Sequence, residues 1–128
     1  MTLRALIVDD NVEFLATARH LLERQGIEVV GVASTGAEAL CRSHEQDPDV
    51  VLVDVNLGEE NGFDLAERLS TGSVRRPVVL ISTQSEQDLE DLLETSSAIG
   101  FVSKLQLSAQ AIIEVLDHRD RDHTPPFS

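Results

Sequence analysis

The sequence predicts an α/β fold, in which a doubly wound, five-stranded parallel sheet carries helices on both of its faces. Short apolar runs alternate along the chain with segments whose apolar residues recur at helical spacing. This alternation repeats five times, as it does in a series of β-strand–helix units. The length of 128 residues suits one domain rather than two.

Five apolar runs are the predicted strands. The strongest signal is Val50-Val51-Leu52-Val53, because a run of aliphatic residues is typical of a parallel strand buried on both faces. Right-handed crossovers leave few arrangements for five such units, and the flavodoxin-like strand order 2-1-3-4-5 is the natural choice at this length. The predicted strands cover residues 3–8, 27–33, 50–54, 77–81 and 99–102.

The first two helices are predicted from apolar spacing and from signals at their ends. The first ends at Gly26, since glycine is common just after a helix. The second begins at Thr35, which can form a capping box with Glu38, and ends at Asp47-Pro48. We expect the first helix to bury Phe14, Leu15, Ala18, Leu21 and Leu22, and the second to bury Ala37, Leu40, Cys41 and His44.

The last three helices follow the third, fourth and fifth strands. The third covers about residues 63–69 and ends near Gly72. Ser85 is placed to cap the fourth helix, and Ser108 is placed to cap the fifth. We expect the fourth helix to bury Leu89, Leu92 and Leu93 on one face, and the fifth to bury Ala111, Ile112, Val115 and Leu116.

Composition narrows the classes of partner. The 10 Lys and Arg residues against 23 Asp and Glu residues give a net charge of −13, which argues against nucleic acids and anionic membranes as main partners. A single cysteine excludes an internal disulfide framework and a multi-thiolate zinc site. No apolar run approaches the ~20 residues of a membrane span, and no signal peptide is recognised, so we expect a cytoplasmic chain. We expect one domain over residues 1–118 and a polar tail over residues 119–128 that includes Pro125-Pro126.

Polar residues stand at the carboxyl ends of four predicted strands, which is where doubly wound sheets bind their ligands. Three carboxylates, a hydroxyl and an ammonium group are therefore expected to converge. Carboxylates this close repel one another unless a cation neutralises them, and oxygen ligands favour a hard divalent ion such as Mg²⁺. The residues of this candidate site are Asp9, Asp10, Asp54, Ser82 and Lys104.

The same residue types suggest phosphoryl chemistry. A metal ion and Lys104 can neutralise phosphoryl oxygens, and the Ser82 hydroxyl can donate a hydrogen bond to one of them. A carboxylate can also be the nucleophile and form an aspartyl-phosphate. Asp54 is best placed for this role, because it alone follows the central strand.

These positions, each after an apolar strand, resemble the receiver domain of two-component response regulators. The resemblance spans about residues 2–118. It includes the segment Asp54–Leu65, which keeps the family's spacing from phosphoacceptor to glycine, and the aromatic residue Phe101 three positions before the lysine. Two positions depart from the family pattern. Leu105 stands where a proline usually follows the lysine, and Gly58 stands where the loop often has proline.

The resemblance implies a signalling switch rather than an enzyme. Asp54 would accept a phosphoryl group from a phosphohistidine on a sensor histidine kinase or phosphotransfer protein, and slow self-dephosphorylation could follow. Asp10, Asp54 and the backbone carbonyl of Asn56 would bind Mg²⁺ directly, whereas Asp9 would act on the metal through water.

The resemblance also implies how the site would signal. Ser82 would move toward the phosphoryl group and Phe101 would turn inward, which couples the site to the face formed by the fourth helix, the fifth strand and the last helix. That face would bind a partner, and a homodimer through the same face is left open. The fourth helix is acidic, which suits a basic or apolar partner or simply a solvated surface; its carboxylates are Glu86, Asp88, Glu90, Asp91 and Glu94.

Plainer interpretations stay open beside these. The Asp9-Asp10 pair and Ser82 could cap helices, and Phe101 could belong to the core. A degenerate receiver, which acts as an interaction module without phosphorylation, remains an alternative because Leu105 replaces the usual proline. A phosphohydrolase of the haloacid dehalogenase type is disfavoured, since Asn56 stands where such enzymes carry a second acid. A flavin or nucleotide binder is disfavoured because no Gly-rich loop follows the first strand.

Overall fold

The computed structural model describes residues 2–71 and 76–122 of the chain. Within them, five parallel strands form one sheet in the order β2-β1-β3-β6-β7. This is the predicted order 2-1-3-4-5, since β6 and β7 are the fourth and fifth strands of the main sheet, so the predicted fold class is confirmed. The strands are β1 (Arg4–Val8), β2 (Glu28–Ala33), β3 (Val50–Asp54), β6 (Val78–Ser82) and β7 (Gly100–Ser103).

Helices follow each of these strands. A short antiparallel hairpin, β4 (Asn56–Leu57) and β5 (Glu60–Asn61), lies between β3 and the third helix, and the sequence did not predict it. Short 3-10 turns, η1 (Gln87–Leu89) and η2 (Lys104–Gln106), follow β6 and β7. The helices are α1 (Val12–Arg24), α2 (Gly36–Gln46), α3 (Gly62–Thr71), α4 (Glu90–Glu94) and α5 (Ala109–Asp122).

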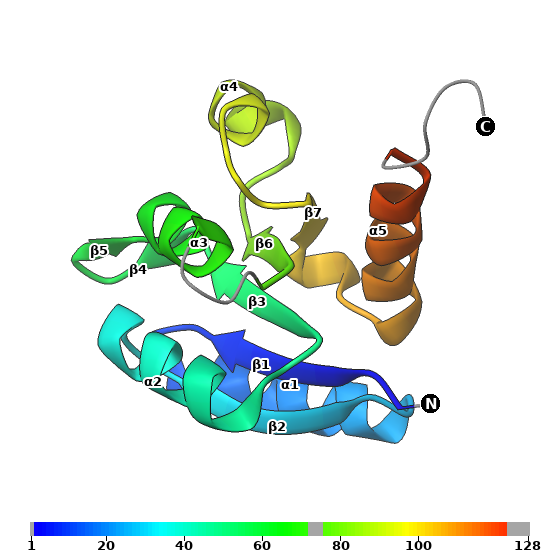
Figure 1. The fold of residues 1–128 in the computed structure, drawn as a ribbon. Helices are drawn as coiled ribbons and strands as arrows, with labels where there is room; N and C mark the ends of the chain where they lie inside the picture. Colours follow the sequence, from blue (N-terminus) through cyan, green and yellow to red (C-terminus); the bar gives the residue numbers. More distant parts are fainter. Residues whose placement is uncertain (1, 72–75, 123–128) are drawn as a thin grey trace.

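Apolar layers lie on both faces of the sheet, because side chains alternate along each strand. In β1, Ala5 and Ile7 belong to the layer covered by α1 and α5, whereas Leu6 and Val8 belong to the layer covered by α2 and α3 (Figure 1). β3 and β6 are buried along their whole length, as the aliphatic runs predict. Because the five strands are parallel, their carboxyl ends lie together at one edge of the sheet.

Polar side chains hold the starts of the helices, as predicted. The Glu38 N–H donates to Thr35 Oγ1 at 3.1 Å at the start of α2. The Ala111 N–H donates to Ser108 Oγ at 3.0 Å at the start of α5. Ser85 caps the turn before α4 in the same way. Each hydroxyl satisfies a backbone donor that has no partner inside its helix.

The expected buried face of α2 is wrong. The helix buries Gly36, Ala39 and Ser43, and Cys41 is exposed rather than buried. All three buried residues are small, so the helix axis can approach the sheet closely along this stripe. Leu40 is only partly buried beside it.

The expected buried face of the fourth helix is partly wrong. Leu89 is buried and Leu93 is partly buried, but Leu92 is 53% exposed. The reason is that Leu89 ends the 3-10 turn η1 and only five residues, Glu90–Glu94, form α4. The tighter turn changes the rotation between these positions, so three leucines do not share one face.

The last helix is longer than expected. α5 continues to Asp122, into the segment predicted as a polar tail. Residues 123–128, with Pro125-Pro126, lie outside the described residues, as does Gly72, near which α3 was expected to end. The division into a domain over 1–118 and a tail over 119–128 stays a prediction. No helix in the described ranges combines the length and the apolar character needed to cross a membrane.

Candidate functional site

The sheet brings the candidate side chains to its carboxyl edge. β1 and β3 lie next to each other where the strand order reverses, which is the usual ligand site of a doubly wound sheet. β6 and β7 continue the sheet on the far side of β3. The candidate residues end or directly follow these four strands: Asp9 and Asp10 after β1, Asp54 at the end of β3, Ser82 at the end of β6, and Lys104 after β7.

Three carboxylates meet at this edge. One oxygen from each of Asp9, Asp10 and Asp54 lies within 4.8 Å of the others. Asp9 is fully buried and Asp54 is 6% exposed, whereas Asp10 is exposed. The cluster is therefore buried on its sheet side and reaches solvent through Asp10.

Lys104 is the one cation in contact with these carboxylates among the described residues. Its Nζ lies 2.5 Å from Asp9 Oδ2 and 3.3 Å from Asp54 Oδ2. The same Nζ stands 4.4 Å from the centroid of the Phe14 ring, a cation–π geometry. Asp9 Oδ2 is buried without a hydrogen-bond partner, so the ion pair with Lys104 is what compensates its charge. One ammonium group thus faces three carboxylates, and negative charge remains in excess.

Backbone N–H groups orient the buried carboxylates. The Asn11 N–H donates to Asp9 Oδ1 at 2.8 Å, and the Asn56 N–H donates to Asp54 Oδ1 at 3.3 Å. Asn11 is itself the N-cap of α1, because its side chain accepts the Phe14 N–H. The acidic pair therefore does not cap this helix, which removes the plainer interpretation of Asp9 and Asp10.

Ser82 is the last residue of β6, the strand that pairs with β3. It is 1% exposed, and its Oγ accepts the Gln84 N–H at 3.0 Å. An accepting hydroxyl keeps its own proton free to donate. In the sheet register Asp54 pairs with Ile81, so Ser82 lies one position further along the neighbouring strand.

The Asp54 carboxyl is electrostatically perturbed. Burial first, and then the negative charge of Asp9, raise the pKa of Asp54 to about 6, while Lys104 and the Asn56 N–H oppose the rise. Without a metal ion, Asp54 therefore holds a proton more readily than an ordinary aspartate. A divalent cation among the carboxylates favours the charged form and lowers this pKa.

The donor set fits Mg²⁺. The three grouped residues offer only carboxylate oxygens, which are the hard ligands that Mg²⁺ and Ca²⁺ prefer. Two of the three carboxylates are buried and one is solvent-exposed, which suits an ion that keeps several waters.

Comparison with known proteins gives the family. The sequence profile described as "Response regulator receiver domain" matches residues 5–117. The chain belongs to this family. Its sheet order and the acidic cluster at the carboxyl edge agree with the resemblance noted in the sequence.

Individual relatives carry the receiver domain within longer chains. The chain is 31% identical to a putative transcriptional regulator of Pseudomonas aeruginosa, over 86% of this chain and 56% of that protein. It is 33% identical to a protein-glutamate methylesterase/protein-glutamine glutaminase of Archaeoglobus fulgidus, over 80% of this chain and 30% of that protein. The chain thus spans about half or less of these relatives. The signal receiver domain of the putative response regulator NarL from Mycobacterium tuberculosis superposes with a TM-score of 0.77 at 27% identity, covering 93% of this chain and 97% of that one.

Steric contacts explain why glycines stand at positions 58 and 62 in the loop after Asp54 of this receiver domain. A Cβ on Gly62 would collide with the backbone carbonyl of Asp54, and the Gly62 N–H donates to the Val55 carbonyl at 2.9 Å. Gly58 turns the hairpin with a φ of +62°, and a Cβ there would stand 3.3 Å from Asp10 Oδ2. The loop therefore folds back onto its own start and packs against the acidic cluster.

Glu60 is a structural residue of this loop that the sequence did not reveal. Both of its carboxylate oxygens accept the Gly36 N–H, at 3.0 and 3.1 Å. Gly36 begins α2, where N–H groups lack helical partners and attract negative charge. A Cβ on Gly36 would lie 2.5 Å from Glu60 Oε1, so a side chain at this position would displace the Glu60 carboxylate. Glu60 thereby connects the β4-β5 hairpin, which contains Asn56, to α2. Glu60 and Gly36 are too far apart in the sequence for a local pattern to reveal this contact.

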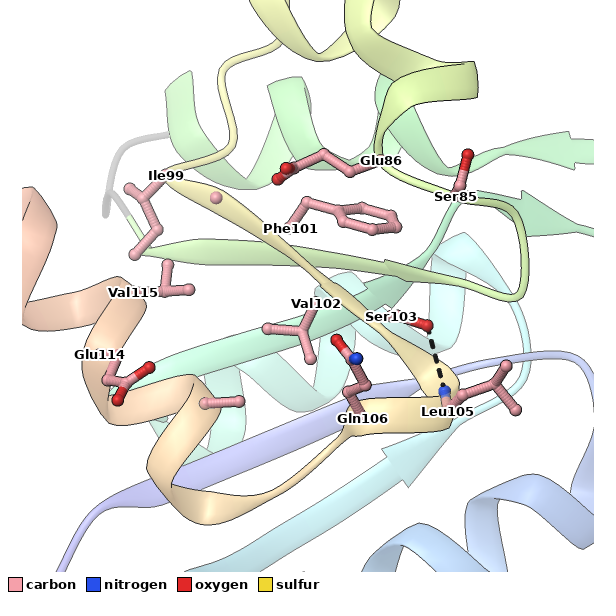
Figure 2. Close-up of a pocket in the computed structure, with 12 residues that line it drawn as sticks. Ser85, Glu86, Ile99, Phe101, Val102, Ser103, Leu105, Gln106, Glu114 and Val115 are labelled. Carbon is pink, nitrogen blue, oxygen red and sulfur yellow. Dashed lines mark hydrogen bonds between the residues drawn. The ribbon is translucent and has the colours of Figure 1, made fainter.

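Phe101 lines a groove that is separate from the acidic cluster. Figure 2 shows its ring on the side of β7 that faces Ser85 and Glu86, with Val102 and Val115 on the other side. Phe101 is partly buried against the layer that α2 and α3 cover. The groove has a volume of about 720 Å³ and runs from the segment before α4, over β7, to α5.

Proposed function

We propose that this receiver domain is phosphorylated on Asp54 by a sensor histidine kinase or a phosphotransfer protein, in a reaction that requires Mg²⁺. The observation that carries the proposal is the arrangement of Asp54 between Lys104 and two further carboxylates. An Asp54 oxygen attacks phosphorus, the bond between phosphorus and the histidine nitrogen breaks, and the imidazole leaves with the electron pair. The product is an aspartyl-phosphate and a free histidine on the donor.

Oxygen donors of the chain would hold the metal ion. We assign direct ligation to Asp10, Asp54 and the backbone carbonyl of Asn56, and a water-mediated role to Asp9. The ion supplies positive charge that lowers the pKa of Asp54 and neutralises phosphoryl oxygens. Asp9 is buried and one of its oxygens is already paired with Lys104, which suits a water-mediated contact with the ion rather than direct ligation.

Lys104 and Ser82 would stabilise the phosphorylated state. Lys104 Nζ already lies 3.3 Å from Asp54 Oδ2, so a phosphoryl group on Asp54 comes within its reach. The Ser82 proton is free to donate to a phosphoryl oxygen after a small movement of the strand end. Phe101, partly buried on the adjacent strand, would turn inward and change the face formed by α4, β7 and α5.

The domain would act as a switch for a partner rather than as an enzyme that turns over a substrate. A homodimer through the α4-β7-α5 face would serve the same switch, and we expect no direct contact with nucleic acid or membrane from so acidic a chain. With a histidine kinase or phosphotransfer protein as the donor, we expect the reaction to take place in the cytoplasm. Activities outside the receiver domain would come from other segments or other proteins, as the longer relatives suggest.

A beryllofluoride titration tests this proposal. In the presence of Mg²⁺, beryllofluoride should bind Asp54 as a phosphoryl mimic and shift the amide resonances of Asp54, Ser82, Phe101 and Lys104. Asp54→Asn should abolish the shifts, as should removal of Mg²⁺. If the wild-type domain shows no response, it is a degenerate receiver that acts without phosphorylation.

A further inference from the structure

The groove that runs from the segment before α4, over β7, to α5 has an apolar floor. Ile99, Phe101 and Val115 line it, and each is only partly buried. At one end of the groove Leu105 is 86% exposed. A volume of about 720 Å³ accommodates several apolar side chains. Apolar side chains gathered in a hollow of this size are typical of a surface that another molecule covers.

The rim of the same groove is acidic. Glu86 directly precedes the 3-10 turn η1, and Glu114 lies on α5. A second hollow adjoins the groove at Glu86 and is lined by Glu90 and Glu94 around Leu93. In the described part of the chain, neither hollow is lined by a lysine or an arginine.

The sequence that surrounds the groove is acidic. Residues 83–122, up to the end of α5, contain nine acidic residues and three Lys or Arg residues, which are Lys104, Arg119 and Arg121. Lys104 does not serve the groove, because its ammonium group is paired with Asp9 and Asp54. Among the side chains that the structure describes, which do not include those of residues 118–122, no salt bridge pairs Glu86 or Glu114. The lining of the groove and of the adjoining hollow thus carries carboxylates and no Lys or Arg around an apolar floor, which gives it an excess of negative charge.

We infer that this groove binds a basic amphipathic segment of a protein partner, which inserts apolar side chains over Phe101 and places Lys or Arg against Glu86 and Glu114. This inference rests on the proposed function, because it names the partner of the face that phosphorylation would switch. An amphipathic helix has the required pattern, with apolar anchors at helical spacing and cations on its flanks. Opposite charges across the rim supply specificity and speed association.

A second copy of the domain fits this face less well. A symmetric dimer places the same patch of each copy against the other. Here the contact would set Glu86 and Glu114 of one copy against the acidic rim of the next, with like charges opposed. Nucleic acid is disfavoured for the same electrostatic reason.

Designed peptides test the inference. One probe is a helical peptide of leucine and lysine, about 15 residues long, and the other has glutamate in place of every lysine. Fluorescence anisotropy at an ionic strength of about 0.15 M should show binding of the lysine peptide only. Amide shifts should map to β7 and to the groove side of α5. Equal binding of both peptides, or shifts confined to α2 and α3, would overturn the inference.

Matched charge variants separate the groove from the general acidity of the chain. Glu86→Gln/Glu114→Gln should weaken binding of the lysine peptide by about threefold to tenfold. Glu13→Gln/Glu67→Gln removes the same charge from exposed positions elsewhere and should change affinity less than about twofold. Equal losses in the two variants would mean nonspecific attraction and would overturn the inference. So would a wild-type dimer through this face that ignores the peptide.

The two proposals fail separately. A domain that binds beryllofluoride but not the lysine peptide would overturn only the partner inference. A domain that binds the peptide in the groove but does not respond to beryllofluoride would overturn the phosphorylation proposal and leave the partner chemistry standing.

Discussion

Asp54→Asn is expected to stabilise the metal-free fold, and more strongly at high pH. An unfolded aspartate has a pKa of about 3.9, whereas burial and the charge of Asp9 raise the pKa of Asp54 to about 6. The folded state therefore binds this proton more tightly than the unfolded state. The wild-type free energy of unfolding thus falls as pH rises from about 4 through about 6.

The magnitude follows from the pKa difference. At about 1.36 kcal/mol per pKa unit, the charged Asp54 destabilises the fold by up to about 3 kcal/mol above this window. The asparagine is uncharged, and its carbonyl can still accept the Asn56 N–H that Asp54 Oδ1 accepts. We expect a net gain of about 2 kcal/mol at pH 8, or roughly 6–12 °C in Tm for a domain of this size. At pH 5 the gain should be about half as large.

Mg²⁺ should stabilise the wild type more than it stabilises Asp54→Asn. A ligand that binds only the folded state adds about 1.4 kcal/mol at ten times its Kd, or roughly 3–6 °C here. The wild type should gain this increment. Asp54→Asn should gain less, because it has lost one carboxylate donor. NaCl at matched ionic strength should give a smaller shift that is equal in both proteins.

Thermal melts followed by circular dichroism measure all of these effects, at pH 5 and pH 8, in chelator, in Mg²⁺ and in matched NaCl. Asp64→Asn is the control, because it removes an exposed carboxylate at the start of α3. The reasoning is refuted if Asp54→Asn gains the same stability at both pH values, or if Mg²⁺ stabilises both proteins equally.

Three further outcomes follow from the contacts of the site. Lys104→Ala should keep Mg²⁺ binding but lose most of the conformational response to beryllofluoride in titrations followed by NMR. Loss of both Mg²⁺ binding and the response would mean that Lys104 also holds the loop after β7 in place. Gly36→Ala should weaken Mg²⁺ binding, because the new methyl group displaces Glu60. In a Glu60→Ala background the same substitution should cause no further loss of Mg²⁺ affinity. Calorimetry on the wild type, the two single variants and the double variant should show this non-additivity. Gly62→Ala should destabilise the fold by about 2 kcal/mol or more in urea melts, since its Cβ collides with the Asp54 carbonyl; an unchanged midpoint contradicts the steric role.

The sheet and its polar edge could be predicted because their signals are local. The run Val50–Val53 is aliphatic on every residue since β3 is buried on both faces, and its first polar residue, Asp54, marks the strand end. The same rule located Ser82 at the end of β6. Crossover handedness left few strand orders, and the one that suits this chain length placed residues far apart in sequence at one edge.

Features that depend on tertiary contacts could not be predicted. The buried face of α2 is set by how closely Ala39 and Ser43 let the helix approach the sheet. The exposure of Cys41 could not be predicted, because it depends on this tertiary contact. Leu92 is exposed because a 3-10 turn precedes α4. The bond between Glu60 and Gly36 joins the β4-β5 hairpin to the start of α2, and these two segments are adjacent only after the sheet has formed. Local periodicity contains no information about such pairs.

Phosphorylation of the intact domain by acetyl phosphate, followed by localisation of the product, tests the central claim most directly. With Mg²⁺, intact mass spectrometry should show the gain of one phosphoryl group, and borohydride reduction before tandem mass spectrometry should place the modification at Asp54. Chelation of Mg²⁺ or Asp54→Asn should remove the signal. A phosphoryl group on another residue, or full labelling of Asp54→Asn, would contradict the assignment of Asp54 as the phosphoacceptor.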